Sequence, residues 1–181
     1  MRDADLDHVL ASALEQEHIE RFSFADLSGL VVTEAGSLRL SALLYQEVSR
    51  HDAADVLEAS LDDFEPLNGE FLSTLSRWQL ESTSATQSGF GDANAAEVEV
   101  LLACLTSIGS RLRAVLAGLT RALPRFGRYA AQYDAALSHA STDGLRWVTG
   151  VGLLSCHVVW AELHQDLLST SGRARLDPQA R

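Results

Sequence analysis

Apolar residues recur at helical spacing along most of the chain. The clearest run covers residues 93–123, where apolar residues return every three or four positions. Its members are Val98, Leu101, Leu105, Ile108, Leu112, Leu116, Leu119 and Leu123. Pro124 follows this stripe and lacks the N–H that would continue a helix. The pattern therefore predicts one long helix that ends near residue 123.

The same spacing predicts further helices on both sides of this one. Pro66 suits the first turn of a helix, and Gly172 suits a helix end. Residues 82–92, rich in Ser, Thr and Gly, predict a loop. We expect helices at about residues 5–20, 41–64, 66–81, 125–140 and 145–169, and a short helical turn at 22–28.

One short region has a different pattern. Two β-prone runs, Leu30–Thr33 and Leu38–Leu40, flank the Gly-containing stretch Glu34–Ser37, which predicts a small hairpin. The sequence thus predicts an all-α protein, a helical bundle of about five to six helices with a small β-hairpin near the N-terminus. Helix, hairpin, helix is the order that a winged-helix module keeps when its recognition helix is missing.

The charge of the chain is concentrated in its first third. The 181 residues include 14 Arg, no Lys and 25 Asp or Glu, for a net charge of −11. Residues 1–65 hold 15 acids and 4 Arg, whereas residues 66–181 hold 10 of each. A nucleic-acid or anionic-membrane surface needs a basic face, so neither is an expected partner. We predict an acidic, degenerate winged-helix-like segment at 1–63, a helical domain at 64–172 and a flexible tail at 173–181.

Targeting and redox signals are weak. The first residues lack the basic and apolar regions of a signal peptide. No uninterrupted apolar stretch reaches the roughly 18 residues of a membrane span, and the nearest one, 147–163, contains His157 and Glu162. Cys104 and Cys156 are too few for a disulfide framework. These features predict a cytoplasmic protein that does not enter a membrane.

The last predicted helix carries the residues best suited to chemistry. His157 and His164 lie seven positions apart, on one helix face, and histidine titrates near neutral pH. They are candidate acid/base groups, with Trp160 between them as an apolar wall. Glu162, the third candidate catalytic residue, lies about 160° around the helix and would reach a neighbouring arginine.

Two other interpretations of these histidines stay open. Both can be core residues bonded to carbonyls, or they can bind a metal. Two turns of helix separate them by about 10.5 Å, which is too far for one ion without further partners. We therefore expect neither a metal nor a cofactor.

Other side chains are candidates for holding a ligand. Arg125 and Tyr129 follow Pro124 at a helix start, where an arginine can hold a carboxylate or phosphate. A surface arginine cluster is the alternative. Arg146 and Trp78 complete the candidate substrate-binding set.

Several stretches resemble a helical domain of many actinobacterial proteins, usually found behind a winged-helix, MarR-like module. The resemblance covers residues 64–175. That family usually has an Asn-Asp-His-like stretch before the long helix, where this chain has Gly91-Asp92-Ala93-Asn94. The resemblance implies no established activity. It rests on Phe64–Leu72 with Trp78–Leu80, on Leu123–Tyr129 with Asp143, Gly144 and Trp147, and on Ser155–His164 with Gly172 and Arg175.

These observations favour a small-molecule-binding protein. Its expected chemistry is that of a cofactor-independent acid/base enzyme, of cyclase, lyase or isomerase type, in specialised metabolism. One alternative is a MarR-like regulator, which the acidic N-terminal half opposes. Another is a non-catalytic interaction domain that forms a homodimer through the long amphipathic helix.

Overall fold

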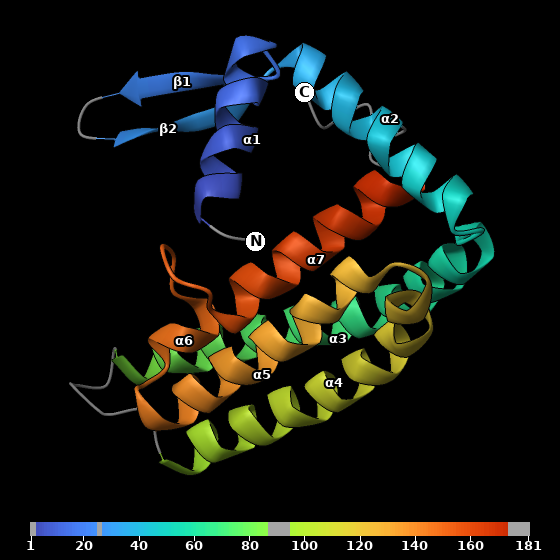
Figure 1. The fold of residues 1–181 in the computed structure, drawn as a ribbon. Coiled ribbons are helices and arrows are strands. Elements are labelled where there is room, and N and C mark those ends of the chain that lie inside the picture. Colours follow the sequence, from blue (N-terminus) through green and yellow to red (C-terminus); the bar gives the residue numbers. More distant parts are fainter. Residues whose placement is uncertain (1–2, 25–26, 87–94, 174–181) are drawn as a thin grey trace. The chain divides into compact units, whose positions relative to one another are not determined.

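Helices dominate the fold, and the described residues include one two-stranded hairpin (Figure 1). The computed structural model describes residues 3–24, 27–86 and 95–173. The chain divides into two units, Met1–Val48 and Ser49–Arg181. The prediction of an all-α bundle with a small hairpin near the N-terminus is confirmed.

The N-terminal unit consists of a helix, a hairpin and most of a second helix. The strands are antiparallel, with Ile19 opposite Val32 and Phe24 opposite Leu27. Across the hairpin, the Phe22 ring covers the position where Gly29 has no side chain. The elements are α1 (Asp3–Glu15), β1 (Ile19–Phe24), β2 (Leu27–Val32) and α2 (Glu34–Arg50).

The predicted position of the hairpin is wrong. Where a helical turn was expected over 22–28, residues 22–24 end β1 and residues 27 and 28 begin β2. Glu34–Ser37, expected as the turn of the hairpin, begins helix α2. Thr33 explains this helix start, because its Oγ1 accepts a hydrogen bond from the Gly36 N–H at 3.0 Å. It therefore acts as the N-cap of α2.

Gly36 is tied to its place by the backbone of the preceding turn. A Cβ added there would lie 1.8 Å from the His18 carbonyl oxygen. The Thr33 hydroxyl donates to the Glu17 carbonyl at 2.6 Å, in the same turn. The β-prone residues before Gly36 thus end a strand, and the glycine permits close packing rather than a hairpin turn.

The second unit is a bundle of long helices. Helix α3 packs on α4, α4 on α5, α5 on α7 and α7 on α3, and the short α6 packs on α5 and α7 (Figure 1). The elements are α3 (Ala54–Thr86), α4 (Ala95–Ala122), the 3₁₀ turn η1 (Pro124–Phe126), α5 (Gly127–Thr142), α6 (Arg146–Thr149) and α7 (Cys156–Ser171).

The predicted stripe of the long helix forms one wall of the core. Seven of its eight predicted members are buried, and the eighth, Val98, is half-buried. Helix α4 has the length and hydropathy of a membrane-spanning helix, although the buried stripe packs inside the bundle. The core residues from the other helices include Leu57, Leu61, Phe64, Leu67, Phe71, Tyr129, Tyr133, Val159, Trp160, Leu163 and Leu167.

The predicted helix start at Pro66 is also wrong. Helix α3 runs through Pro66, so the domain boundary expected between residues 63 and 64 falls inside this helix, and the two units divide between Val48 and Ser49. The actual break lies at Asp52, whose φ of 48° is left-handed. A proline inside a helix costs roughly 3 kcal/mol, and the buried stripe of α3 continues on both sides of it, which stabilises the unbroken helix.

The single helix expected over 145–169 is wrong as well. Gly150 is extended and Gly152 has a φ of 84°, so the helix stops after α6 and restarts at Cys156. Gly172 ends α7 in the left-handed conformation, as predicted. Helix α3 covers the first part of the predicted loop, and residues 87–94 and 174–181 lie outside the described residues.

Candidate functional site

Ser155 sets the start of helix α7, which carries the predicted catalytic residues. Its Oγ accepts a hydrogen bond from the Val158 N–H at 3.3 Å and donates to the Gly150 carbonyl at 2.9 Å. Ser155 is fully buried, so this N-cap fixes the rotation of α7 against the bundle.

The two candidate histidines have different surroundings. His157 is exposed. His164 is half-buried, with its Nε2 3.1 Å from Glu65 Oε1 and its ring 5.4 Å from the Phe64 ring. Glu162 is exposed on another side of the helix. None of these three residues lines the cavity beside Trp78 or the groove beside Leu14.

Trp160 lies in the core rather than at a surface. Its side chain is 2% exposed, and it stacks on Phe71 with ring centroids 4.2 Å apart and on Phe64 at 5.1 Å. Its Nε1 donates to Asn68 Oδ1 at 2.9 Å. The ring therefore joins α7 to α3.

A polar cluster joins helix α7 to the start of α5. Asp166 accepts from Arg125 Nη1 at 2.6 Å and from the Tyr129 hydroxyl at 2.8 Å. Arg125 Nη2 also donates to Thr170 Oγ1 at 2.7 Å, and Arg128 donates to the Tyr129 oxygen at 2.6 Å. The structure thus brings together the predicted pair Arg125 and Tyr129.

Asp166 is the member of this cluster that the sequence interpretation did not select. The predicted partner for the arginines was Glu162, which lies one helical turn earlier on the same side of α7. Asp166 is only 16% exposed, so its carboxylate meets Arg125 away from bulk water. The arginines therefore hold an internal carboxylate in this structure, rather than presenting their donors to a ligand.

Local hydrogen bonds and burial shift the pKa values in this cluster. Burial raises the pKa of the Tyr129 hydroxyl to about 12; the hydrogen bond from Arg128 opposes this rise and the hydrogen bond to Asp166 adds to it. The hydrogen bond to Tyr129 raises the pKa of Arg128, and the more distant Glu162 adds to this effect. Tyr129 therefore stays protonated at neutral pH and acts as a donor.

Arg146 lies at a separate surface, near the end of α5. It is exposed, and its charge helps to lower the pKa of Asp143, for which the hydrogen bond from His139 is the main cause. His139 Nδ1 lies 2.7 Å from the Asp143 carboxylate, and the imidazole stacks on Trp147 at 4.3 Å. Arg146 is therefore not brought together with Arg125.

Trp78 borders a cavity between helices α3 and α4. The cavity has a volume of about 180 Å³, and Thr74, Arg77, Glu97 and Cys104 line it as well. The Trp78 Nε1 is buried and has no hydrogen-bond acceptor among the described residues. Trp78 is thus a predicted site residue that borders a cavity.

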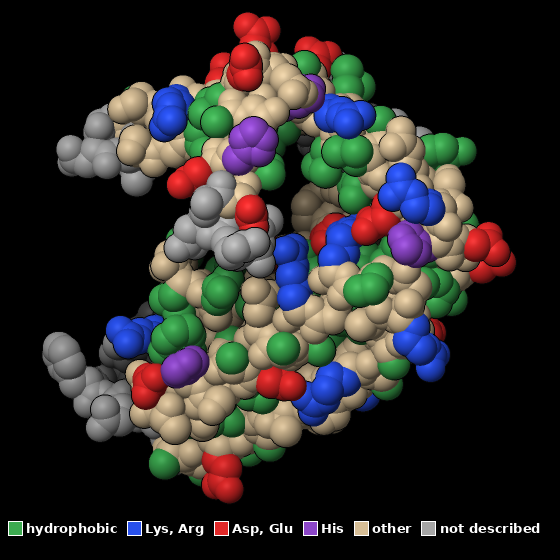
Figure 2. All heavy atoms as spheres, viewed as in Figure 1, with side chains coloured by type: hydrophobic (Ala, Val, Ile, Leu, Met, Phe, Trp, Pro, Cys, Tyr) green, Lys and Arg blue, Asp and Glu red, His purple; other side chains and the backbone are tan. Residues whose placement is uncertain are grey.

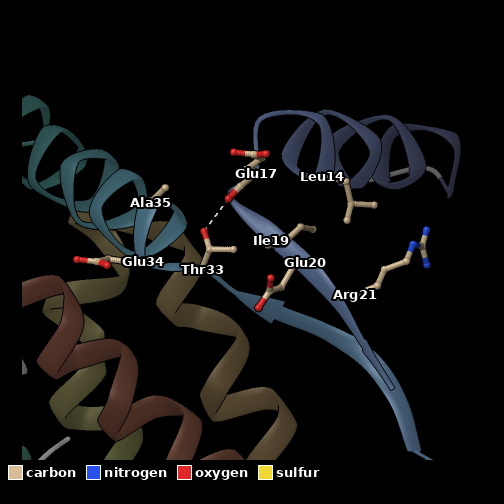
Figure 3. Close-up of a pocket in the computed structure, with 8 residues that line it drawn as sticks. All are labelled: Leu14, Glu17, Ile19, Glu20, Arg21, Thr33, Glu34 and Ala35. Carbon is tan, nitrogen blue, oxygen red and sulfur yellow. Dashed lines mark hydrogen bonds between the residues drawn. The ribbon is translucent and has the colours of Figure 1, made fainter. Parts of the chain in front are cut away.

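A larger groove lies inside the N-terminal unit. It has a volume of about 710 Å³ and is formed by α1, β1 and the start of α2 (Figure 3). Leu14 from α1 and Ile19 from β1 line it between the helix and the strand, with Glu17 and Glu20 beside them. No sequence motif pointed to this groove, because its residues come from three elements.

Comparisons with known proteins add no identification. No protein-family model, curated protein or solved structure matches this chain. Within the described residues, no three His, Cys, Asp or Glu side chains are grouped so that they could hold a metal ion. The interpretation of the site therefore rests on the geometry above.

Raising the pH above about 9 should destabilise the helical unit. Burial raises the pKa of the Cys156 thiol from 9.0 to about 12, raises that of Tyr129 from 10.0 to about 12, and raises that of Tyr133 as well. These groups are neutral when protonated. Because their pKa values are higher in the folded protein than in the unfolded chain, the protonated form stabilises the folded state. Their contribution to the free energy of unfolding is fully present below pH 9 and is lost as the pH rises towards 12. Each group loses about 1.4 kcal/mol per pH unit once the pH passes its unfolded-state pKa.

Urea unfolding at several pH values checks this expectation. The Cys156→Ala variant removes the group with the lowest unfolded-state pKa, so its decline should begin near pH 10, where tyrosine ionises in unfolded chains. A free energy of unfolding that stays constant between pH 8 and 11 would contradict the burial of these groups.

Proposed function

We propose that this protein is a non-catalytic interaction protein that binds a basic protein partner on its N-terminal unit. One observation carries the proposal. Among residues 5–48 whose side-chain burial is described, Gly36 is the only buried residue. Eleven large apolar side chains of this unit are exposed: Leu6, Val9, Phe22, Phe24, Leu30, Val31, Val32, Leu38, Leu40, Leu43 and Tyr45.

This exposure is concentrated in the N-terminal unit. The described part of the second unit, which is far longer, exposes four large apolar residues, Leu72, Val100, Val151 and Leu154. Folding needs buried apolar area to offset the loss of chain entropy, and a short unit without a core has little. A partner that covers these side chains would supply the missing burial, as contiguous exposed apolar surface often does at protein interfaces.

Charge favours a basic partner over a second copy of the chain. Residues 1–48 contain nine acids and three Arg, a net charge of −6. Figure 2 shows acidic side chains beside apolar ones near the end of α1 and the start of α2, and a basic side chain over the hairpin. Two such surfaces would repel each other, whereas a basic partner gains attraction and a faster encounter. An apolar surface of this charge also disfavours DNA, whose phosphates need cations.

The groove of Figure 3 is the best anchor for such a partner. Leu14 and Ile19 offer apolar contact, and the lining also holds three carboxylates, of Glu17, Glu20 and Glu34, against one arginine, Arg21. An amphipathic helix with an apolar stripe beside lysine or arginine matches both features. The chemistry of the partner thus follows from the composition of the groove.

The acid/base enzyme expected from the sequence stays a prediction. His157 is exposed, His164 is hydrogen-bonded to Glu65, and Trp160 is enclosed by core rings. The predicted dimer through α4 stays a prediction too, and its apolar stripe packs inside its own unit. Neither hypothesis has the support that the exposed N-terminal side chains give to partner binding.

Hydrogen exchange of the full-length chain tests the proposal. The probe is a synthetic amphipathic helix with leucine on one face and lysine on the other, and its matched control carries glutamate in place of lysine. Amides of α1, β1, β2 and α2 should exchange rapidly in the protein alone and at least about tenfold more slowly with the lysine peptide. Amides of the helical unit serve as the internal reference.

Matched variants locate the contact. Leu38→Ser and Tyr45→Ser should weaken peptide binding, whereas Leu72→Ser, at an exposed apolar site on α3, should not. Equal protection by the glutamate peptide would overturn the role of charge. If amide protection instead rises with protein concentration and sedimentation shows a dimer, the surface binds a second copy of the chain and not a basic partner. Slow exchange in the isolated monomer would show that no partner is needed.

A further inference from the structure

The cavity between α3 and α4 has the features of a binding site that is independent of the N-terminal unit. Its volume of about 180 Å³ is below the roughly 300–1,000 Å³ of drug-sized sites. Leu101 and Val100 give it an apolar side, and Thr74, only 7% exposed, adds a buried hydroxyl. A cavity of this size admits a small metabolite and excludes a nucleotide.

The Trp78 ring, which belongs to the lining of this cavity, carries a donor without an acceptor. The Trp78 Nε1–H is buried, and the described residues provide no partner for it. A buried donor without a partner loses its hydration without compensation. Trp160 differs, because its Nε1 is bonded to Asn68, whereas the buried Nε1 of Trp147 also has no partner among the described residues. An acceptor brought by a ligand would satisfy Trp78.

Two opposite charges border the same cavity. Arg77 and Glu97 both line it, from α3 and α4. Elsewhere in the bundle, arginine and carboxylate pair directly, as in Arg111 with Glu70 at 2.5 Å. Neither Arg77 nor Glu97 forms an ion pair with any described residue within 4.0 Å. One cation and one anion are therefore available on the cavity wall.

We propose that this cavity binds a small zwitterion of the amino-acid class. The ligand carboxylate would pair with Arg77 and accept from the Trp78 Nε1–H. Its ammonium group would pair with Glu97, and its apolar side chain would lie against Leu101. Such a ligand provides an acceptor for the indole and an opposite charge for each of Arg77 and Glu97. A neutral, purely anionic or purely cationic ligand provides only part of this set.

The cysteines provide a direct readout. Cys104 lines the cavity and is half-buried, whereas Cys156 is fully buried in the bundle. The rate of Cys104 alkylation by iodoacetamide is measured in the full chain with each natural L-amino acid. At about ten times its Kd, a ligand should slow this reaction about tenfold, because only unliganded protein reacts. Cys156 should react slowly throughout.

Analogues of the best amino acid separate its two charges. If phenylalanine protects Cys104, then 3-phenylpropionate, which lacks the ammonium group, and phenethylamine, which lacks the carboxylate, should each bind at least about tenfold more weakly. Expected Kd values for the amino acid lie between about 10 μM and 1 mM, as suits a small ligand.

Matched variants assign the contacts. Arg77→Gln and Glu97→Gln should each raise the Kd about tenfold or more, and Trp78→Phe, which keeps a ring and loses the N–H, should raise it several-fold. Arg121→Gln and Glu99→Gln change exposed α4 residues outside the cavity lining and should leave the Kd unchanged. Circular dichroism verifies that each variant is folded.

Three results would overturn the proposal. They are the absence of Cys104 protection by every amino acid, equal protection by the analogue without an ammonium group, and an unchanged Kd in Arg77→Gln. None of these outcomes involves the N-terminal unit. The binding of an amino acid in the cavity can therefore be refuted without refuting the binding of a basic partner, and the reverse.

Discussion

Replacing Trp160 by alanine should lower the free energy of unfolding of the helical unit by about 3–5 kcal/mol. The side chain is 2% exposed and is stacked on Phe71, with planes 12° apart, and on Phe64. Tyr133 meets it edge-on at 5.8 Å. Alanine would leave a cavity that rings held by α3 and α5 cannot fill. Urea unfolding followed by circular dichroism measures the loss.

Trp160→Phe is the matched control. It keeps an aromatic ring against Phe71 and removes the hydrogen bond to Asn68, so its cost should be near 1–2 kcal/mol. Equal losses in the two variants would assign the stability to the hydrogen bond instead of the rings. A loss below about 1 kcal/mol for alanine would contradict the core position.

The long helices could be predicted because their signal is local and repeated. In α4, each apolar residue supports the same helix face as the next, so the burial of Leu101 through Leu119 follows from spacing alone. The ends of α4 and α7 were predictable for a related reason. Pro124 and Gly172 act through their own backbone, whatever surrounds them.

The breaks that the sequence misplaced depend on packing. Pro66 is an intrinsic helix breaker, yet α3 continues through it because Leu67 and Phe71 extend the stripe begun by Leu57 and Leu61. Gly36 suggests a turn, yet its role is to let α2 approach the His18 carbonyl. In both cases a tertiary contact reverses the local preference, and a single sequence does not contain that contact.

In the candidate site too, contacts between residues close in sequence could be predicted, and contacts between distant residues could not. Arg125 and Tyr129 lie one helical turn apart, and their association was predicted. Their acceptor, Asp166, lies 41 positions after Arg125, and Glu65 lies 99 positions before its partner His164. Helix α7 has two acids, Glu162 and Asp166, and either could satisfy an arginine equally well on a helical wheel. The choice of Asp166 over Glu162 follows from the rotation that Ser155 and the buried face impose on α7.

Replacing Asp166 by alanine should cost about 3 kcal/mol of unfolding free energy, at the lower end of the range for breaking a buried pair. The substitution removes the acceptor for Arg125 and for the Tyr129 hydroxyl. Asp166 is 16% exposed and Arg125 is 29% exposed, so water can compensate only part of the loss. The pair also holds the start of α5 against α7. Thermal and urea unfolding measure the change.

Glu70→Ala provides the matched control for this effect. Glu70 accepts two hydrogen bonds from Arg111, but both side chains are nearly half-exposed, at 46% and 49%. Exposed pairs contribute about 0–1 kcal/mol, because water and salt screen them. Asp166→Ala should therefore cost at least twice as much as Glu70→Ala, and added salt should reduce the smaller effect more strongly. Equal costs would mean that the Asp166 cluster is solvated like the surface pair, and Arg125 and Tyr129 would then regain their place as candidates for binding a ligand.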